Sequence, residues 1–442
     1  MIDASYASRI SKFEQPINRS SDGEKIIFDQ IIEMAQTILY LITLFILFEF
    51  VLSKVVSWLN LKTWDRPLPD EVKDLYDTQK YKEAKDYAFA NFKLSLISSS
   101  LSLIITLAFL WLRGFAWVDD MAKSFSSSPI LQALVFFAII GAASFVISLP
   151  FDIYGTFVVE EKFGFNKVTP KLFLMDKLKA IVLALVLGGG ILALLTFLFG
   201  LLGDKFWIAA WVVVSGFSIL LAMFYTSLLL PIFNKLIPLD NGELRQSIER
   251  YAAKVKFPLT NIMIMDGSKR STKANAFFSG IGYKKNIVLY DNLVKEMSIE
   301  EITAVLAHEV GHYKKKHVLQ SMVISVIQIG IMFFLFGWLA SKPVMAEVLG
   351  AKENNFHLSL VTFALLYAPV SLVTGLLMNV FSRKNEYEAD AYAKETYSAD
   401  PLVSSLKKLS VNHLSNLQPH PAYVFLHYSH PTLLQRVRAM RK

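Results

Sequence analysis

Seven long apolar runs constrain the fold of this chain more than any other feature. They lie near residues 34–53, 94–112, 130–151, 180–202, 206–230, 318–341 and 358–381. About 18 consecutive apolar residues suffice for an α-helix to cross the hydrocarbon core of a bilayer. Only 19% of the residues are charged, against roughly a quarter in soluble domains. The sequence therefore predicts a mostly α-helical, polytopic membrane protein with seven transmembrane helices.

The distribution of lysine and arginine predicts how these spans are oriented. Of the 45 basic residues, 36 lie in four polar segments that alternate along the chain with four segments holding the other nine. The basic segments are 54–93, 152–179, 231–317 and 382–442. Because such residues concentrate on the cytosolic side, we expect the C-terminus in the cytosol and the N-terminus outside it. The net charge of +8 then reflects topology, and it predicts no binding of nucleic acid.

We expect the chain to divide near residue 230. Residues 1–230 are predicted to form an N-terminal membrane region with five spans and their cytosolic loops. Residues 231–442 contain two long polar stretches, separated by the last two spans. Both stretches fall on the cytosolic side, so we expect them to combine into one folded module.

The motif that carries chemistry is His308-Glu309-Val310-Gly311-His312. Residues i and i+4 share a face of an α-helix, so both imidazoles can reach one zinc ion while Glu309 lies beside them. Ser298 followed by Glu301 predicts a capping box at the start of this helix. Because no proline follows before Ser341, we expect one continuous helix from about residue 299 through the sixth span. At Gly311, the missing side chain would let another backbone approach.

A catalytic zinc ion needs a third protein ligand and an open position for water. The chain contains no cysteine, so the ligands must be histidine or carboxylate. Just after the seventh span, Glu386 and Asp390 share a helical face, which suits a ligand and a carboxylate that orients a histidine. Glu388 points elsewhere and is the weaker candidate. We therefore expect His308, His312 and Glu386 to bind one Zn(2+) per chain, at the cytosolic edge of the membrane.

Such a site predicts the hydrolysis of peptide bonds. Zinc polarises a carbonyl group and lowers the pKa of a bound water. Glu309 is then expected to act as general base and to pass the proton to the leaving amine. The tetrahedral oxyanion needs a further donor. His430, followed six residues later by Arg436, is a candidate for that role.

The segments 275–280 and 286–290 predict two short strands joined by a glycine-containing turn. An edge strand here could bind an extended peptide by β-addition, with Asn275, Ala276 and Phe277 in contact with it. The alternative is a hairpin that only packs beneath the zinc-binding helix.

Several separated segments of the chain resemble the integral-membrane zinc metalloendopeptidases of the CAAX prenyl protease type (type I). These are HEVGH at 308–312, SRKNEYEADAYA at 382–393, NAFFSG at 275–280, YSHPTLLQR at 428–436 and YGTFVVEEKFGFN at 154–166. The resemblance covers roughly residues 60–440. One departure is Asn385, where the family has an aromatic residue before the ligand glutamate.

The resemblance implies a ring of seven long helices around an intramembrane chamber, capped by a cytosolic zincin-like module with a small β-hairpin. It implies the same zinc ligands and general base, with Asp390 supporting a ligand histidine. It places His430, Arg436 and Asn275 along the cleft. Eukaryotic members remove the C-terminal tripeptide of prenylated CAAX proteins, so the implied partners are a peptide or protein substrate, prenylated in that case, and the lipid bilayer.

Other functions remain open from the sequence. A general protease for membrane-protein quality control would need no prenyl group on its substrate. A site-2-type protease is disfavoured because charged residues such as Glu300 and Lys314 flank the motif. A transporter with a structural metal is disfavoured because the spans hold few ionisable residues beyond Glu49. The absence of a retrieval signal after Arg436 favours a bacterial inner membrane over the endoplasmic reticulum.

Overall fold

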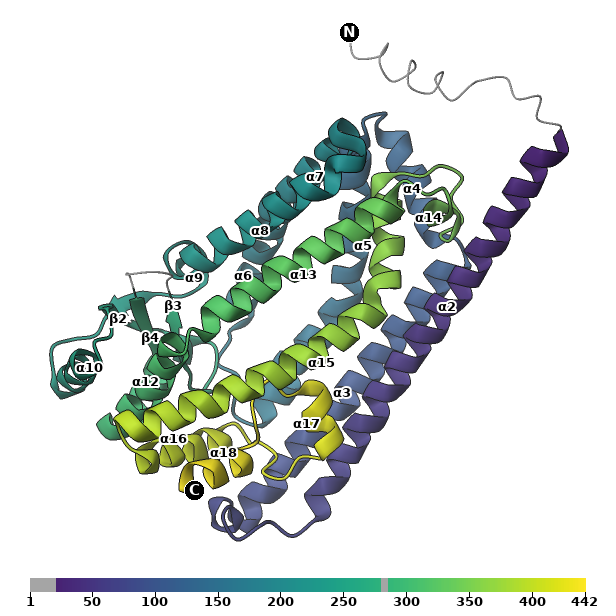
Figure 1. Ribbon diagram of the computed structural model, residues 1–442. Coiled ribbons are helices and arrows are strands. Elements are labelled where there is room, and N and C mark those ends of the chain that lie inside the picture. The colour runs from purple at the N-terminus through teal and green to yellow at the C-terminus, as the bar shows by residue number, and fades with distance from the viewer. Residues whose placement is uncertain (1–20, 280–284) are drawn as a thin grey trace.

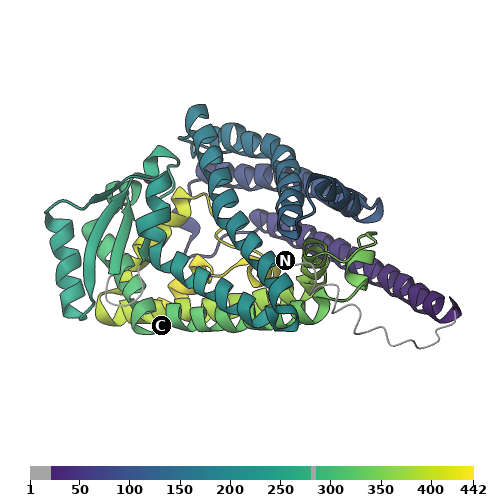
Figure 2. The same ribbon diagram turned by 90° about the horizontal axis from the view of Figure 1, so that it is seen from above.

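The computed structural model describes residues 21–279 and 285–442 and is mostly helical. Long helices stand side by side in a ring, and a smaller module with a sheet lies at one end (Figure 1, Figure 2). The long helices are α2 (Ser21–Lys62), α3 (Thr78–Trp111), α5 (Pro129–Tyr154), α6 (Pro170–Leu183), α7 (Gly189–Leu202), α8 (Phe206–Phe224), α13 (His317–Ala340) and α15 (Phe356–Thr396). The π-helical segments Gly155–Glu160, Ala184–Gly188 and Tyr225–Leu229 extend α5, α6 and α8.

Shorter elements connect the long helices or build the module. The short helices are α4 (Gly114–Phe125), α9 (Leu230–Phe233), α10 (Glu243–Lys254), α11 (Asp291–Glu296), α12 (Ile299–Lys314), α14 (Val344–Glu347), α16 (Ala399–Asn412), α17 (Pro421–His427) and α18 (Leu433–Arg441). Single 3-10 turns lie at Thr63–Asp65, Lys73–Leu75, Gly203–Lys205 and Gly267–Lys269.

Six helical segments of the described residues are long and apolar enough to cross a membrane. One of them, Pro170–Phe233, is 64 residues long. It turns back at Gly203, whose φ of 53° lies in the left-handed region that favours glycine. The segment therefore supplies two antiparallel crossings, which agrees with the predicted seven. The predicted position of the N-terminus falls on residues outside the described ranges.

The exposure of α15 fits a helix in a ring. Val370 and Leu377 are exposed on one side, whereas Ser371 and Gly375 are exposed on another. One exposed face suits contact with lipid, and the second suits the interior of the ring. Pro369 lies inside this helix, where it removes a backbone hydrogen bond and bends the axis. Figure 1 shows α15 changing direction on its way to the module.

The module contains a four-stranded sheet in the order β1-β2-β4-β3. The strands are β1 (Leu236–Pro238), β2 (Leu259–Met265), β3 (Ala276–Ser279) and β4 (Lys285–Tyr290). β3 pairs with β4 in antiparallel register, with Phe277 opposite Val288, so the predicted pair of strands is confirmed. The predicted glycine turn falls on 280–284, outside the described residues. The other two strands are additional, and β2 runs parallel to β4.

The predicted continuous helix from about 299 to 341 is wrong. α12 ends at Lys314 and α13 begins at His317, because Lys316 adopts a left-handed conformation with φ of 60°. The three consecutive lysines place positive charge at the carboxyl end of α12, which favours a helix terminus there. α12 can thus lie within the module while α13 enters the ring (Figure 1).

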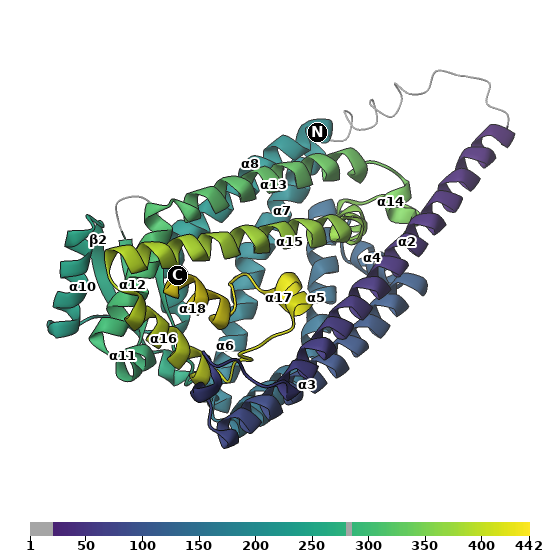
Figure 3. The same cartoon turned by 60° about the horizontal axis from the view of Figure 1, so that its bottom comes forward.

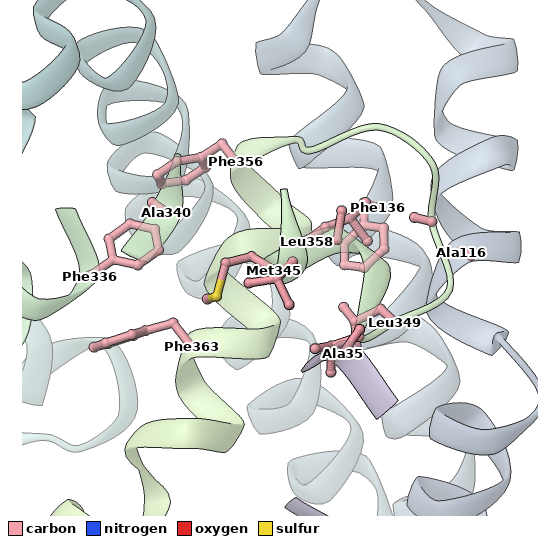
Figure 4. Close-up of a cluster of buried hydrophobic side chains, with 14 of the residues drawn as sticks. Ala35, Ala116, Phe136, Phe336, Ala340, Met345, Leu349, Phe356, Leu358 and Phe363 are labelled. Carbon is pink, nitrogen blue, oxygen red and sulfur yellow. The ribbon is translucent and has the colours of Figure 1, made fainter. Parts of the chain in front are cut away.

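The end of the ring farthest from the module holds a densely packed apolar core. Figure 4 shows Phe136, Phe336, Met345 and Phe363 meeting there from α5, α13, α14 and α15. A polar cluster lies beside the apolar core. Asp119 of α4 and His357 of α15 are each 1% exposed, and His357 Nε2 lies 2.7 Å from Asp119 Oδ1.

Replacing Asp119 tests this cluster. Asp119→Ala is expected to lower the free energy of unfolding by about 3 kcal/mol, because it leaves the buried side chain of His357 without its carboxylate partner. The exposed neighbour Asp120 provides the control, Asp120→Ala. Thermal unfolding in detergent measures both variants, and equal midpoints for the two variants would contradict the expectation.

The effect of Asp119→Ala also depends on pH. Burial opposes the ionisation of Asp119, but hydrogen bonds from His357 and Lys123 outweigh burial and hold its pKa below the ordinary value. A lowered carboxyl pKa adds stability above the unfolded-state pKa of about 3.9, and this stability is lost as the pH falls through the folded-state pKa. The difference from the unmodified protein should therefore shrink in acid.

Candidate metal centre

The first half of the centre is built on α12. The predicted capping box is confirmed, since Ser298 and Glu301 each bond the backbone of the other. Glu301 also accepts hydrogen bonds from Ser404 and Lys408 of α16, which tie the start of α12 to the module. The buried face of α12 includes His308, which is 7% exposed. This rigid, buried helix holds His308 and His312 one turn apart.

A close helix crossing brings the second half of the centre to α12. A Cβ atom on Gly311 would lie 2.9 Å from Ala389 Cα and 3.0 Å from Ala389 O of α15. The expected backbone approach at Gly311 is therefore confirmed. Ala389 stands between Glu386 and Asp390 along α15, so this crossing aligns both carboxylates with the histidine pair.

Adding one methyl group at this crossing is expected to impair activity. Gly311→Ala would push α12 and α15 apart, and a misplacement of about 1 Å at a catalytic site can cost about a hundredfold in rate. Gly375 of α15 has no atom within 4 Å of an added Cβ, so Gly375→Ala is the matched control. Peptide turnover by both variants tests this expectation. Full activity in Gly311→Ala would contradict it and would show that α12 and α15 can move apart without disturbing the site.

Three side chains from the two helices converge on one point. The potential ligand atoms of His308, His312 and Glu386 all lie within 4.8 Å of one another. The Nε2 atoms of His308 and His312 are 3.2 Å apart. Glu386 Oε2 lies 3.5 Å from the Nε2 atom of His308, and Glu386 Oε1 lies 3.3 Å from the Nε2 atom of His312. Glu386 Oε2 is buried and accepts no hydrogen bond from the described residues. Two imidazole nitrogens and a carboxylate with one oxygen free of hydrogen bonds suit a zinc ion.

A salt bridge lies behind the histidine at the start of the motif. His308 Nδ1 is 2.8 Å from Asp390 Oδ1, which leaves Nε2 free to face Glu386. Arg436 of α18 donates to both oxygens of Asp390, at 2.8 and 2.6 Å. Arg436 Nη1 also lies 3.4 Å from Glu386 Oε2. The structure thus places Arg436 against Asp390 and Glu386, deeper than the cleft wall that the resemblance implies.

His430 reaches the centre from the loop between α17 and α18. Its Nε2 lies 3.3 Å from Glu386 Oε1, and its side chain is 62% exposed. Arg383 of α15 donates to the carbonyl of Tyr428 at 2.6 Å and so ties this loop down. Figure 3 shows α17 and α18 lying along α15 on this side. An exposed imidazole at the rim of the centre is available to a substrate.

Glu309 lies on α12 between the two histidines. Burial raises the pKa of its carboxyl above the ordinary value, and the charges of His308 and His312 partly offset this effect. A carboxylate of raised basicity beside a metal site is suited to accept a proton.

The sheet presents a strand beside this centre. β3 begins with Ala276 and Phe277, and among the strands of the described residues it lies at the edge of the sheet, paired with β4 alone. Asn275 lies immediately before it, and Asn275 O accepts a hydrogen bond from Tyr290 N at 3.0 Å. The segment 165–167 binds the backbone at 270–272, just upstream of the strand. This contact gives a structural role to the 154–166 segment, in which no chemistry was recognised.

Two further features were missed in the sequence. Lys273 Nζ lies 2.9 Å from Tyr87 Oη and 3.0 Å from Glu160 Oε2, which links the approach to β3 with α3. His317, in the turn after α12, lies beside His312. A histidine five residues after the motif was the only signal, and its position depends on the unexpected break at Lys316.

A membrane ring, a buried HExxH helix and a glutamate from a second helix together define a membrane metallopeptidase. A family model described as the CAAX prenyl protease N-terminal region with five membrane helices matches residues 57–235. The model of peptidase family M48 matches residues 238–442. The chain belongs to peptidase family M48, in the group that carries this N-terminal membrane region.

Individual relatives agree with this assignment. CAAX prenyl protease 1 of Saccharomyces cerevisiae is 34% identical over 405 residues, which cover 86% of this chain and 89% of the relative. The human CAAX prenyl protease 1 homolog is 30% identical over 420 residues, covering 85% and 88%. The crystal structure of S. mikatae Ste24p superimposes with a TM-score of 0.86 at 33% identity, covering 91% of this chain and 98% of that one. The predicted fold and metallopeptidase class are therefore confirmed.

Proposed function

We propose that this protein is a zinc-dependent endopeptidase that cleaves prenylated CAAX proteins near their C-terminus, at the cytosolic face of its membrane. His308, His312 and Glu386 would hold one Zn(2+) per chain. The observation that carries this proposal is the convergence of their ligand atoms within 4.8 Å of one another, with Glu386 Oε2 buried and lacking a hydrogen bond. The relatives named CAAX prenyl proteases support the choice of substrate.

The residues around the zinc site would divide the chemistry among themselves. Zinc, when bound, would polarise the scissile carbonyl and acidify a water. Glu309 would take the proton from the attacking water and deliver it to the leaving amine. His430 would donate a hydrogen bond to the oxyanion from the rim of the centre. Asp390 would hold His308 in the tautomer whose Nε2 is free to bind metal.

The edge strand β3 would hold the peptide extended. No strand in the described part of the chain pairs with its outer edge, whose backbone groups could therefore bind a substrate strand. Asn275, Ala276 and Phe277 would contact the substrate there, upstream of the scissile bond or beside it. The backbone hydrogen bonds between residues 165–167 and 270–272 support this role, because they hold the segment that leads into β3.

We also propose that the two parts of the chain have different roles. Residues 1–230 would form the membrane region that receives the prenyl group, and residues 231–442 would perform the hydrolysis. Two observations support this division. The two family models meet between residues 235 and 238, and α15 exposes a second face, at Ser371 and Gly375, that suits the interior of the ring. The relatives named above are eukaryotic, so they lend no support to a bacterial inner membrane.

The direct test compares cleavage of one CAAX peptide with and without its farnesyl group, using purified protein and Glu309→Gln as the inactive control. We expect faster cleavage of the farnesylated peptide and cleavage about a thousandfold slower in the variant. Equal cleavage of both peptides would contradict the prenyl requirement and favour general membrane proteolysis. Activity that survives in the variant would contradict the assignment of the general base.

A further inference from the structure

The break between α12 and α13 has a consequence for the proposed zinc site. In a continuous α-helix, a residue five positions after His312 would be rotated by about 140° and would point away from it. The left-handed Lys316 instead turns the chain, so that His317 Nδ1 lies 3.1 Å from His312 Nδ1. The two rings meet nearly edge to face, with centroids 5.2 Å apart. His317 is only 3% exposed, so this contact lies inside the protein.

The opposite nitrogen of His317 meets a third helix. Its Nε2 lies 3.1 Å from Glu388 Oε2 of α15. Glu388 is partly exposed, with Lys384 Nζ 3.8 Å from its other oxygen. The line His312–His317–Glu388 therefore crosses from α12 through α13 to α15. Glu388 lies between Glu386 and Asp390 in sequence but points along a different side of the helix, toward this line.

One assignment of protons satisfies every atom along the line. If His312 Nε2 faces the metal, its proton lies on Nδ1 and is donated to Nδ1 of His317. His317 then carries its own proton on Nε2, which it donates to the Glu388 carboxylate. Both rings are neutral in this arrangement, as a zinc ligand requires.

We propose that His317 and Glu388 are positioning residues that orient His312 as a metal ligand, an inference that rests on the zinc site proposed above. His308 has its own carboxylate, Asp390, in direct contact. Among the described residues, no carboxylate contacts Nδ1 of His312, and His317 links that atom to Glu388 instead. Outer partners of this kind fix the ring and the tautomer of a ligand histidine, and their loss typically weakens metal binding by about 10–100-fold.

The test measures zinc affinity of the full-length purified protein by competition with a chelator. Glu388→Ala and His317→Leu are both expected to weaken zinc binding about 10–100-fold. His317→Asn should recover part of the loss, because its amide oxygen can accept from His312 and its NH₂ group can donate. Lys384→Ala is the control, since it removes a neighbour of Glu388 outside the line. Peptide turnover at saturating zinc should show a smaller loss than turnover at limiting zinc.

The outcomes separate this inference from the proposed function. Unchanged zinc affinity in both Glu388→Ala and His317→Leu, with tight binding by the unmodified protein, would overturn the positioning role and leave the zinc site standing. Equal losses in His317→Asn and His317→Leu would overturn the hydrogen-bond role of His317. An unmodified protein that binds no zinc would defeat the proposed function itself. Glu388→Ala changes a partly exposed side chain, so it carries the test if His317→Leu does not fold.

Discussion

Glu309→Gln is expected to lower the rate of peptide hydrolysis by about a thousandfold, within the range for loss of a general acid–base residue. Glutamine keeps the size of the side chain but cannot take a proton from the attacking water. The histidines and Glu386 remain, so zinc content should stay close to one ion per chain. Turnover of a farnesylated CAAX peptide and metal analysis of the same sample measure the two quantities.

Glu300→Gln is the matched control for this experiment. Glu300 lies in the first turn of the same helix, two residues after the cap Ser298, and its side chain is exposed. The same chemical change there should leave turnover unaltered. A Glu309→Gln protein that lost both zinc and activity would assign Glu309 to metal binding rather than to proton transfer.

Glu386→Ala is expected to remove the metal. The variant loses a ligand, and it also loses the negative charge that faces Arg436 at 3.4 Å. The guanidinium would then repel a cation between the two histidines. We expect zinc affinity to fall by more than about a hundredfold, beyond the usual effect of losing an outer partner of a ligand. Hydrolysis should fall with it and recover only partly at high zinc concentration.

Chelator competition and turnover across a zinc titration measure the effect of Glu386→Ala. Glu395→Ala, on the exposed surface of the same helix, provides the control. Zinc binding equal to that of the unmodified protein would contradict the ligand assignment and would require another carboxylate in its place.

The arrangement around the centre separates two kinds of carboxylate. Glu386 keeps an oxygen without a hydrogen bond and faces both imidazoles, as a ligand does. Asp390 is engaged by His308 and by Arg436, which suits its proposed role of orienting His308. The two residues are one turn apart on α15, and the close crossing at Gly311 brings the whole turn against α12. A single glycine thus determines the spacing between the two halves of the centre.

Local patterns in the sequence were enough to predict much of this protein. The apolar runs and the basic loops follow from neighbouring residues, and so does the capping box at Ser298. The pairing of His308 with His312 on one helical face is equally local, because helical periodicity fixes it. Even the convergence with Glu386 was accessible, because two spans that end at one membrane boundary bring their flanking residues together.

Contacts between distant segments could not be predicted from local patterns and became visible only in the tertiary structure. No local pattern predicts a left-handed lysine at 316, because that conformation is unfavourable for a residue that carries a Cβ atom. The line from His312 to Glu388 depends on it. The parallel pairing of β2 with β4 and the buried contact of Asp119 with His357 likewise join segments far apart in the chain. The sequence by itself determined which segments can span a membrane and which side chains can share one helical face, since these depend on short-range periodicity. The tertiary structure decided which side chains support those residues, since this depends on how the helices cross.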